Sequence, residues 1–140
     1  MMPDSPAGTT GPASAAAHRH VFVYGSLRAG GSNDIARFSP PPERVGDADI
    51  AGTLYDLGAY PGAVLGGEGR VHGEIYRIDA ELEPQLDRLE GIAPDDSGEY
   101  AKREVLVRLG DARLRCLVYE IHPERIVGHG AIRSGDWFRR

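Results

Sequence analysis

The chain has 140 residues, a formal net charge of −5 at pH 7 and an isoelectric point near 5.5. This length fits one folded domain. The negative charge excludes a broad basic surface for nucleic-acid phosphates, so we expect a small-molecule ligand and no nucleic-acid partner.

The N-terminal residues and the cysteine content indicate the compartment. Residues 1–18 are rich in Ala, Gly, Pro, Ser and Thr and lack the basic and apolar regions of a secretory signal, so we expect a disordered leader before a domain at residues 19–140. Cys116 is the single cysteine, which excludes an internal disulfide, and we expect it to be a buried apolar side chain in a cytoplasmic protein. No stretch approaches the roughly 18 apolar residues of a membrane span.

The first predicted strand is the apolar run HVFVY, residues 20–24, which ends at Gly25 and is expected to be buried on both faces. The glycine-rich segment after it does not fit a P-loop, because Gly31 stands where lysine is needed. It also fails the dinucleotide fingerprint, because Leu27 replaces a glycine, and its spacing does not fit a G-x-S-x-G elbow. The backbone N–H groups of Gly25, Ser26 and Leu27 are candidates to bind a carboxylate or carbonyl oxygen; the alternative is an ordinary strand-to-loop turn.

A short helix is predicted next, over NDIARF at residues 33–38, with Ser32 or Asn33 as its N-cap and prolines after it. The following strand is ADIAGTLYDL, residues 48–57. Glycines and a proline then predict a long turn-rich connection over residues 58–69.

The third predicted strand, VHGEIYRI at residues 71–78, has side chains that alternate between two faces. One face would carry Val71, Gly73 and Ile75. The other would carry His72, Glu74, Tyr76 and Ile78. We expect Glu74 to pair with Arg77 or solvent rather than to act as a catalytic acid.

The clearest helix is predicted over DAELEPQLDRLEG, residues 79–91. Asp79 or Glu83 begins it, Pro84 suits its first turn, and Gly91 suits the left-handed position that closes it. Its expected buried stripe consists of leucines spaced i, i+4 and i+7: Leu82, Leu86 and Leu89.

Glu90 is the candidate general base. On a helical wheel it lies about 70° to 80° from the centre of the leucine stripe, so its side chain can lean toward the interior. Partial burial and the negative end of the helix both raise the pKa of a carboxyl, toward the range of a general base at neutral pH. The alternative is a solvated glutamate at a helix end.

The remaining segment, YAKREVLVRLGDARLRCLVYEI at residues 100–121, predicts two strands around a Gly-Asp turn. Tyr100 and Tyr119 are packing aromatics whose hydroxyls could point into a cavity. Asp136 is expected to fix a turn or to cap backbone. The histidines show no metal-ligand spacing, so no metal site is expected. Short strands with two inserted helices predict an α+β domain with a strongly curved sheet.

In this order, the segments resemble the motifs of the γ-glutamylcyclotransferase family, which includes the plant avirulence-induced-gene-like proteins. The matching blocks lie within residues 21–137 and are VFVYGSLRAGGSN, GTLYDLGAYPGAV, VHGEIYRID, LDRLEG, EYAKREV and IRSGDW. The resemblance implies an α+β fold built as a small mixed β-barrel flanked by short helices. One departure is the acidic segment GIAPDDSGE between Glu90 and Tyr100, which is longer than in compact members.

The resemblance also implies an enzyme that cyclises a γ-glutamyl group to 5-oxoproline and releases an amine or amino acid, without a cofactor. In this chain it makes Glu90 the catalytic acid and base. The implied substrate-binding residues are Tyr24, Gly25, Ser26, Leu27, Tyr100 and Tyr119. A protein of the same fold that binds a small ligand without turnover is the alternative, and the oligomeric state is left open.

Overall fold

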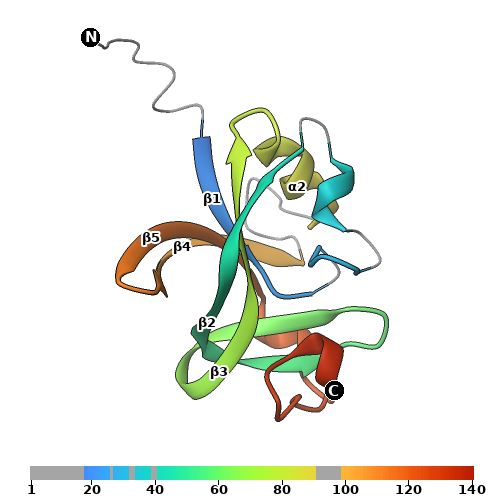
Figure 1. The fold of residues 1–140 in the computed structure, drawn as a ribbon. Helices are drawn as coiled ribbons and strands as arrows, with labels where there is room; N and C mark the ends of the chain where they lie inside the picture. Colours follow the sequence, from blue (N-terminus) through green and yellow to red (C-terminus); the bar gives the residue numbers. More distant parts are fainter. Residues whose placement is uncertain (1–17, 26, 32–33, 39–40, 91–98) are drawn as a thin grey trace, which may run out of the picture.

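The computed structural model describes residues 18–25, 27–31, 34–38, 41–90 and 99–140 (Figure 1). The predicted leader, apart from its last residue, lies outside these ranges. The described residues form one mixed sheet in the order β2-β3-β1-β5-β4. Its strands are β1 (His18–Val23), β2 (Glu43–Asp56), β3 (Pro61–Asp79), β4 (Tyr100–Leu109) and β5 (Ala112–Ile121). Strand β1 is central, antiparallel to β3 and parallel to β5, which confirms an α+β fold with mixed pairing.

The sheet is strongly curved but is not closed into the expected barrel. Strands β2 and β4 are its two edges, and no backbone ladder joins them in the described part of the chain. The edges lie near each other, and the Leu109 side chain of β4 packs against Gly46 of β2. Closure would need a backbone ladder at this position, and a side chain occupies the space instead.

The predicted connection over residues 58–69 is largely wrong, because β3 already begins at Pro61 and pairs with β2 (Figure 1). Within this stretch the ladder is interrupted where the partner of β2 jumps from Leu65 to Arg70. Gly66 and Gly67 have positive φ angles of 95° and 82° in this excursion. Such glycines indicate a turn in sequence, yet within a long hairpin they form a bulge that bends the strand.

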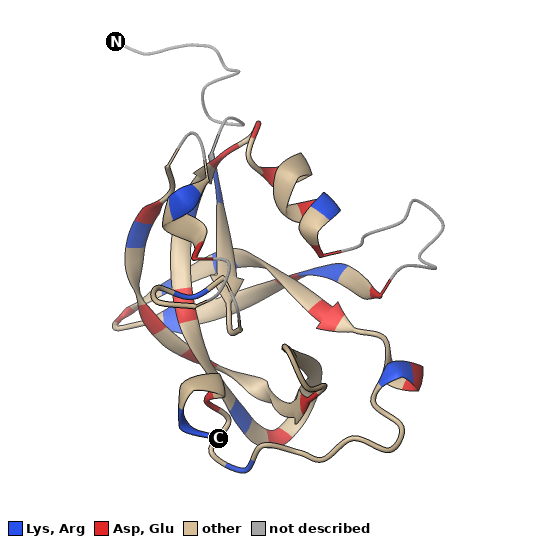
Figure 2. Cartoon of the chain, turned by 90° about the vertical axis from the view of Figure 1, so that its right-hand side faces the viewer, with Lys and Arg blue, Asp and Glu red and all other residues tan. Residues whose placement is uncertain are grey.

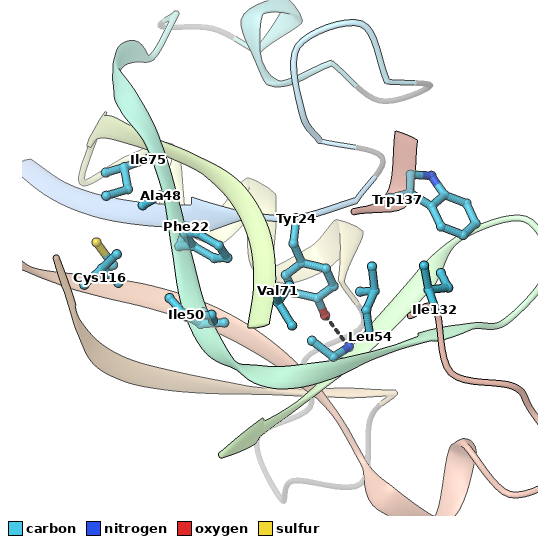
Figure 3. Packing of buried hydrophobic residues seen from close by; sticks show 13 residues of the cluster. Phe22, Tyr24, Ala48, Ile50, Leu54, Val71, Ile75, Cys116, Ile132 and Trp137 are labelled. Atoms are coloured by element: carbon cyan, nitrogen blue, oxygen red, sulfur yellow. Dashed lines mark hydrogen bonds between the residues drawn. The ribbon is translucent and has the colours of Figure 1, made fainter. Parts of the chain in front are cut away.

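Both faces of β1 are buried, as the sequence predicted. On β1, Phe22 belongs to one hydrophobic cluster, and Val21 belongs to a second cluster on the opposite face. Strand β3 behaves in the same way, with Val71 in the first cluster and Ile78 in the second. Figure 3 shows the first cluster, which extends from Cys116 to Trp137. Cys116 is fully buried, as expected.

Helix α2 (Glu83–Leu89) begins at the later of the two predicted positions, with proline in its first turn. Leu82 and Leu86 are buried as predicted, but Leu89 is 43% exposed. The prediction for Leu89 is wrong because the helix has only seven residues and ends at this leucine, beyond the part that packs on the sheet.

The other described helical segments are short 3-10 turns: η1 (Ile35–Arg37), η2 (Pro123–Arg125) and η3 (Trp137–Arg139). The Asp34 carboxylate caps η1 by accepting from the Ala36 amide, in place of the predicted Ser32 or Asn33, which lie outside the described residues. Strands β4 and β5 form the predicted hairpin around Gly110. None of the described helices is long and apolar enough to cross a membrane.

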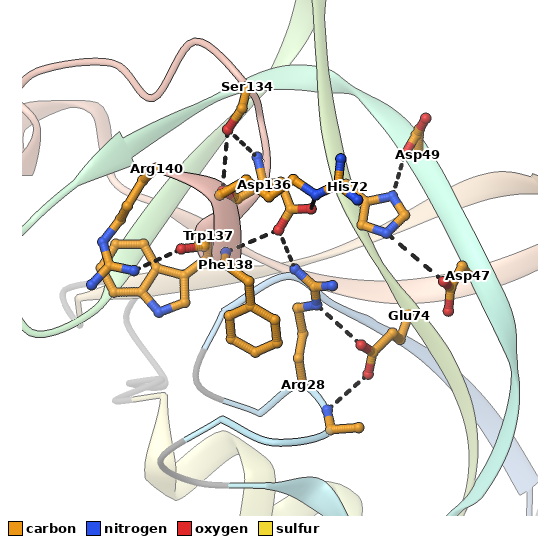
Figure 4. Close-up of polar contacts among 12 residues, drawn as sticks. Arg28, Asp47, Asp49, His72, Glu74, Ser134, Asp136, Trp137, Phe138 and Arg140 are labelled. Carbon is orange, nitrogen blue, oxygen red and sulfur yellow. Dashed lines mark hydrogen bonds and ion pairs between the residues drawn. The ribbon is translucent and has the colours of Figure 1, made fainter.

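A buried ion cluster holds the loop after β1 in place (Figure 4). Arg28 Nε donates to Glu74 Oε2 at 3.1 Å, and Arg28 Nη1 donates to Asp136 Oδ1 at 2.7 Å. The Glu74 carboxylate also accepts from the Ala29 amide at 2.9 Å. These three charged residues are at most 8% exposed. The expectation that Glu74 pairs with Arg77 or solvent is wrong, because the loop after β1 folds over β3 and brings the Arg28 guanidinium to it.

Asp136 has the predicted capping role as well. Its carboxylate accepts from the Phe138 amide at 2.9 Å at the start of η3. Burial alone would raise the pKa of this carboxyl, but the hydrogen bonds from Arg28 and the Phe138 amide hold it below its ordinary value. The cluster therefore joins the β1 loop, strand β3 and the C-terminal segment.

We predict that Arg28→Met lowers the free energy of unfolding by about 3 kcal/mol or more, because it removes the one buried cation that Glu74 and Asp136 share. The cations that remain, Arg44 at 3.8 Å from Glu74 and Arg139 at 3.6 Å from Asp136, are exposed and cannot replace it. Urea denaturation at pH 7 measures the loss. The matched control is Arg77→Met, whose exposed pair with Glu43 should contribute about 1 kcal/mol or less. Equal losses for the two variants would contradict a special role for the buried cluster.

Candidate active site

A cavity of about 250 Å³ lies where the end of β1, the turn before β3, the end of α2 and the start of β4 meet. Its described lining residues come from segments far apart in sequence. They are Phe22, Val23, Tyr24, Gly25, Leu27, Ala59, Tyr60, Pro61, Leu89, Glu90, Glu99, Tyr100 and Tyr119.

The fold brings the predicted site residues together around this cavity. The lining includes every one that lies in the described ranges: Tyr24, Gly25, Leu27, Glu90, Tyr100 and Tyr119. Ser26 lies outside the described residues. The acidic segment before Tyr100 does not displace this tyrosine from the cavity.

Gly25 is buried where β1 runs into the cavity wall. A Cβ atom at this position would lie 2.7 Å from Cγ of Pro61, at the start of β3. Since such a contact is too short for any larger side chain, glycine allows the strand end to approach the opposite wall. The glycine that ends the first predicted strand therefore has a packing role beside the cavity.

The three predicted tyrosines use their hydroxyls to bind protein groups. Tyr24 Oη donates to the carbonyl oxygen of Tyr119 at 2.6 Å and accepts from the Ala63 amide at 3.1 Å. Tyr100 Oη donates to the carbonyl oxygen of Pro61 at 2.7 Å. Burial is the main cause that raises the pKa of each phenol above its ordinary value, so the hydroxyls stay protonated. These tyrosines stabilise the walls of the cavity.

Helix α2 is attached to the sheet by ionic contacts that set the position of its C-terminal end. Lys102 Nζ of β4 lies 2.5 Å from Glu83 Oε2 and 2.8 Å from Asp87 Oδ2. The other oxygen of Asp87 accepts from Tyr119 Oη at 2.7 Å. Because these contacts involve both turns of the helix, they fix the position of the residue after it, at the edge of the cavity.

Glu90 is that residue. Its amide donates to the carbonyl oxygen of Leu86 at 2.9 Å, and its partly buried side chain lines the cavity. Burial raises the pKa of Glu90 to about 7, and the negative charge of Glu99 adds to the shift. Burial is one of the two causes that the sequence predicted for an upward shift of this pKa, and the second contribution comes from Glu99 rather than from the end of the helix. The Glu90 carboxyl can accept or release a proton near neutral pH.

Sequence reasoning missed two residues of this site, Glu99 and Tyr60. Glu99 directly precedes β4 and is a second carboxylate in the lining, so acidic positions follow α2 and precede β4 (Figure 2). Tyr60 Oη donates a short hydrogen bond to Glu99 Oε2. Both residues stand in segments that the family motifs cover, GAYPG and EYAK. Their pairing across 39 positions has no signal in the local sequence.

The described residues contain no group of three or more His, Cys, Asp and Glu side chains that could hold a metal ion. In the described part of the cavity, the group suited to proton transfer near neutral pH is the Glu90 carboxyl. The walls around it are mostly aromatic and aliphatic.

Comparisons with known proteins point to one family. Residues 21–139 match the family described as "Gamma-glutamyl cyclotransferase, AIG2-like". The chain is 38% identical over 121 residues to the "Gamma-glutamylcyclotransferase family protein YtfP" of Escherichia coli, a match that covers 86% of this chain and 96% of that protein. It is also 38% identical over 128 residues to a "Putative gamma-glutamylcyclotransferase" of Vibrio cholerae, with the same coverage.

Solved structures show the same fold. The solution structure of ytfP from Escherichia coli is 39% identical, has a TM-score of 0.58 and is matched over 86% of this chain and 97% of that one. The crystal structure of an AIG2-like protein from Mus musculus is 24% identical and has a TM-score of 0.68, over 84% and 87% of the two chains. At that identity, the mouse protein supports the fold alone.

The pKa of Glu90 predicts a pH-dependent effect on stability. Its pKa is higher in the folded chain, about 7, than the ordinary value of 4.5 expected when unfolded. The folded state therefore holds the extra proton between these values, and its stability falls as the pH rises through this interval. Glu90→Gln keeps a neutral side chain at every pH. At about 1.4 kcal/mol per pKa unit, it should be more stable than the natural chain by up to about 3 kcal/mol above pH 8.

At pH 4 the two chains should have nearly equal stability, because Glu90 is then protonated in both states. Urea denaturation at pH 4 and at pH 8.5 measures the two differences. Glu81→Gln is the matched control, since Glu81 is exposed and does not line the cavity. A Glu90→Gln gain that is the same at both pH values would contradict the raised pKa.

Proposed function

The chain belongs to the gamma-glutamyl cyclotransferase, AIG2-like family, and we propose that it cyclises a γ-glutamyl amine or γ-glutamyl amino acid to 5-oxoproline. The free amine or amino acid is the second product. The observation that supports this best is that Glu90, with a pKa near 7, lines the same 250 Å³ cavity as the end of β1 at Gly25 and Leu27. The domain that carries this activity would comprise residues 19–140.

The first step of the proposed reaction is loss of a proton from the substrate's α-ammonium group. An α-amine has a pKa of about 8, so it is mostly protonated at neutral pH and cannot attack. The Glu90 carboxylate takes the proton, since its own pKa is close enough to that of the amine for transfer in both directions. Its position in the cavity wall places it beside any ligand that enters.

The second step closes the ring. The α-nitrogen forms a bond to the γ-carbonyl carbon, and the γ-carbon to nitrogen bond of the leaving amine breaks. Glu90 returns its proton to the leaving nitrogen. The attacking nitrogen also gives up a second proton as it becomes the ring N–H, and this proton passes through the same carboxylate to the amine product, which leaves as an ammonium ion. The substrate is thus divided into 5-oxoproline and an amine without water or a co-reactant. The cavity contributes by holding the glutamyl chain folded, with its amine against its own carbonyl.

The backbone at the end of β1 would bind the substrate's negative oxygens. Gly25 and Leu27 line the cavity opposite the end of α2, and amide groups at such a position can bind a carboxylate or a developing oxyanion. Their placement depends on the Arg28 cluster, which begins one residue later. Tyr24, Tyr100 and Tyr119 would limit the shape of the pocket through their rings, since their hydroxyls are engaged by the protein.

We predict that Glu90→Gln lowers kcat by about 10² to 10⁴, because proton transfer by a positioned base contributes that much. Formation of 5-oxoproline from a panel of γ-glutamyl compounds measures the rate. Glu81→Gln, outside the cavity, should retain full activity. A folded natural chain that binds the panel without turnover would replace this proposal with the alternative, a ligand-binding protein.

The pH dependence of kcat/KM gives a separate prediction. The base must be deprotonated, so the rate should rise with pH and level off above about 7, the pKa of Glu90. Glu99→Gln removes a negative charge that raises this pKa, so it should move the rising limb to lower pH. Steady-state rates from pH 5 to pH 9 measure the rising limb for the natural chain and for the variant. An unchanged limb in the variant would contradict the coupling of the two carboxyls.

A further inference from the structure

The charged side chains in the described lining of the cavity are all acidic. Among its described lining residues, the side chains that carry charge as ordinary acids or bases are Glu90 and Glu99, and neither arginine nor lysine is present. Arg125 of η2 lies near enough to influence the Tyr60 phenol, but it is not part of the lining. A ligand that fills this cavity therefore meets two carboxylates.

The two carboxylates have different relations to the cavity. The lining residues Tyr24, Gly25, Leu27, Tyr100 and Tyr119 are buried, whereas Tyr60 is 37% exposed and Leu89 is 43% exposed. The inner end of the cavity is therefore the end of β1, and its mouth is the side of Tyr60 and Leu89. Glu99 is hydrogen-bonded to Tyr60, which places it on the side of the mouth.

Tyr60 keeps the Glu99 side chain in this position. The phenol donates to Glu99 Oε2, and this hydrogen bond is the largest of the causes that raise the pKa of Tyr60. A phenol that stays protonated remains a donor at neutral pH. The carboxylate of Glu99 is thus oriented by the wall of the mouth rather than free to turn into solvent.

The direction of the substrate follows from the proposed function, on which this inference rests. The γ-glutamyl part must enter first, because it is cyclised beside Glu90 and the end of β1. The leaving amine then extends toward the mouth and passes Glu99. A carboxylate on this amine would be repelled by Glu99, while an ammonium group would be attracted.

We infer that Glu99 is a specificity-determining residue that selects substrates whose leaving amine carries a second positive charge, the γ-glutamyl diamines. γ-Glutamyl amino acids, whose leaving group carries a carboxylate, are disfavoured. Glu99 acts on the tail of the substrate and takes no part in the proton transfers of ring closure. Tyr60 is the positioning residue that orients it.

Three substrates of similar length test this selection: γ-glutamyl derivatives of 1,4-diaminobutane, n-pentylamine and 4-aminobutanoate. Their leaving amines end in an ammonium, a methyl and a carboxylate group. With the natural chain, we expect kcat/KM to fall in that order, by about tenfold at each change of charge. Most of the difference should lie in KM, because the tail is bound equally in the ground state and the transition state.

The variants separate selection by charge from a structural effect. Glu99→Gln should reduce the preference for the diaminobutane compound over the pentylamine compound from about tenfold to less than about threefold. The 4-aminobutanoate compound should improve in the same variant. Glu99→Asp keeps the charge and should retain part of the preference, and Tyr60→Phe should weaken it. Glu68→Gln, an exposed glutamate outside the cavity, is the control for a simple change in net charge.

Binding of the three compounds to Glu90→Gln, measured by calorimetry, tests the selection without turnover. The same order of affinities would support the inference even with no detectable reaction. Turnover of all three at equal rates would overturn the selection by Glu99 and leave the proposed function standing. Absence of both turnover and binding would overturn both proposals.

Discussion

The buried contact of Arg28 with Glu74 and Asp136 is the interaction on which the site depends (Figure 4). A strand end alone would leave the loop after β1 free to take many conformations. The guanidinium joins this loop to strand β3 and to the C-terminal segment, where two carboxylates satisfy its charge in the interior. Gly25 and Leu27 are therefore held in the cavity wall by a contact that makes no use of the cavity itself.

A second set of charged residues fixes the other wall of the cavity, at the end of α2. Lys102 holds Glu83 and Asp87 of α2 against the sheet, and Tyr119 binds Asp87 from β5. The helix is too short to be stable alone, so these contacts decide where its end lies. The Glu90 carboxyl is thereby kept in an environment that opposes its ionisation, and its pKa is about 7. The ion pairs of Lys102 with Glu83 and Asp87 thus influence the pKa of Glu90 indirectly, by fixing the position of the helix end.

Much of the candidate site could be predicted from local sequence. HVFVYG indicates a buried strand that ends at a glycine, and LDRLEG indicates a helix that ends at a glutamate. The lining contains Tyr24 and Gly25 from the first motif and Glu90 from the second. Leu89 and the turn at residues 58–69 were predicted wrongly, because their environments depend on where the helix and the hairpin end rather than on residue type.

The sequence by itself determined the α+β class, the two-sided burial of β1 and the order of the family motifs. These features follow from the spacing of apolar residues and from glycine and proline, which act over a few neighbouring positions. Only the tertiary structure decided that the sheet stays open, that Glu74 pairs with Arg28, and that Glu99 meets Tyr60 at the mouth of the cavity. Such contacts join residues 39 or more positions apart, and their free energy depends on burial and on distance in space.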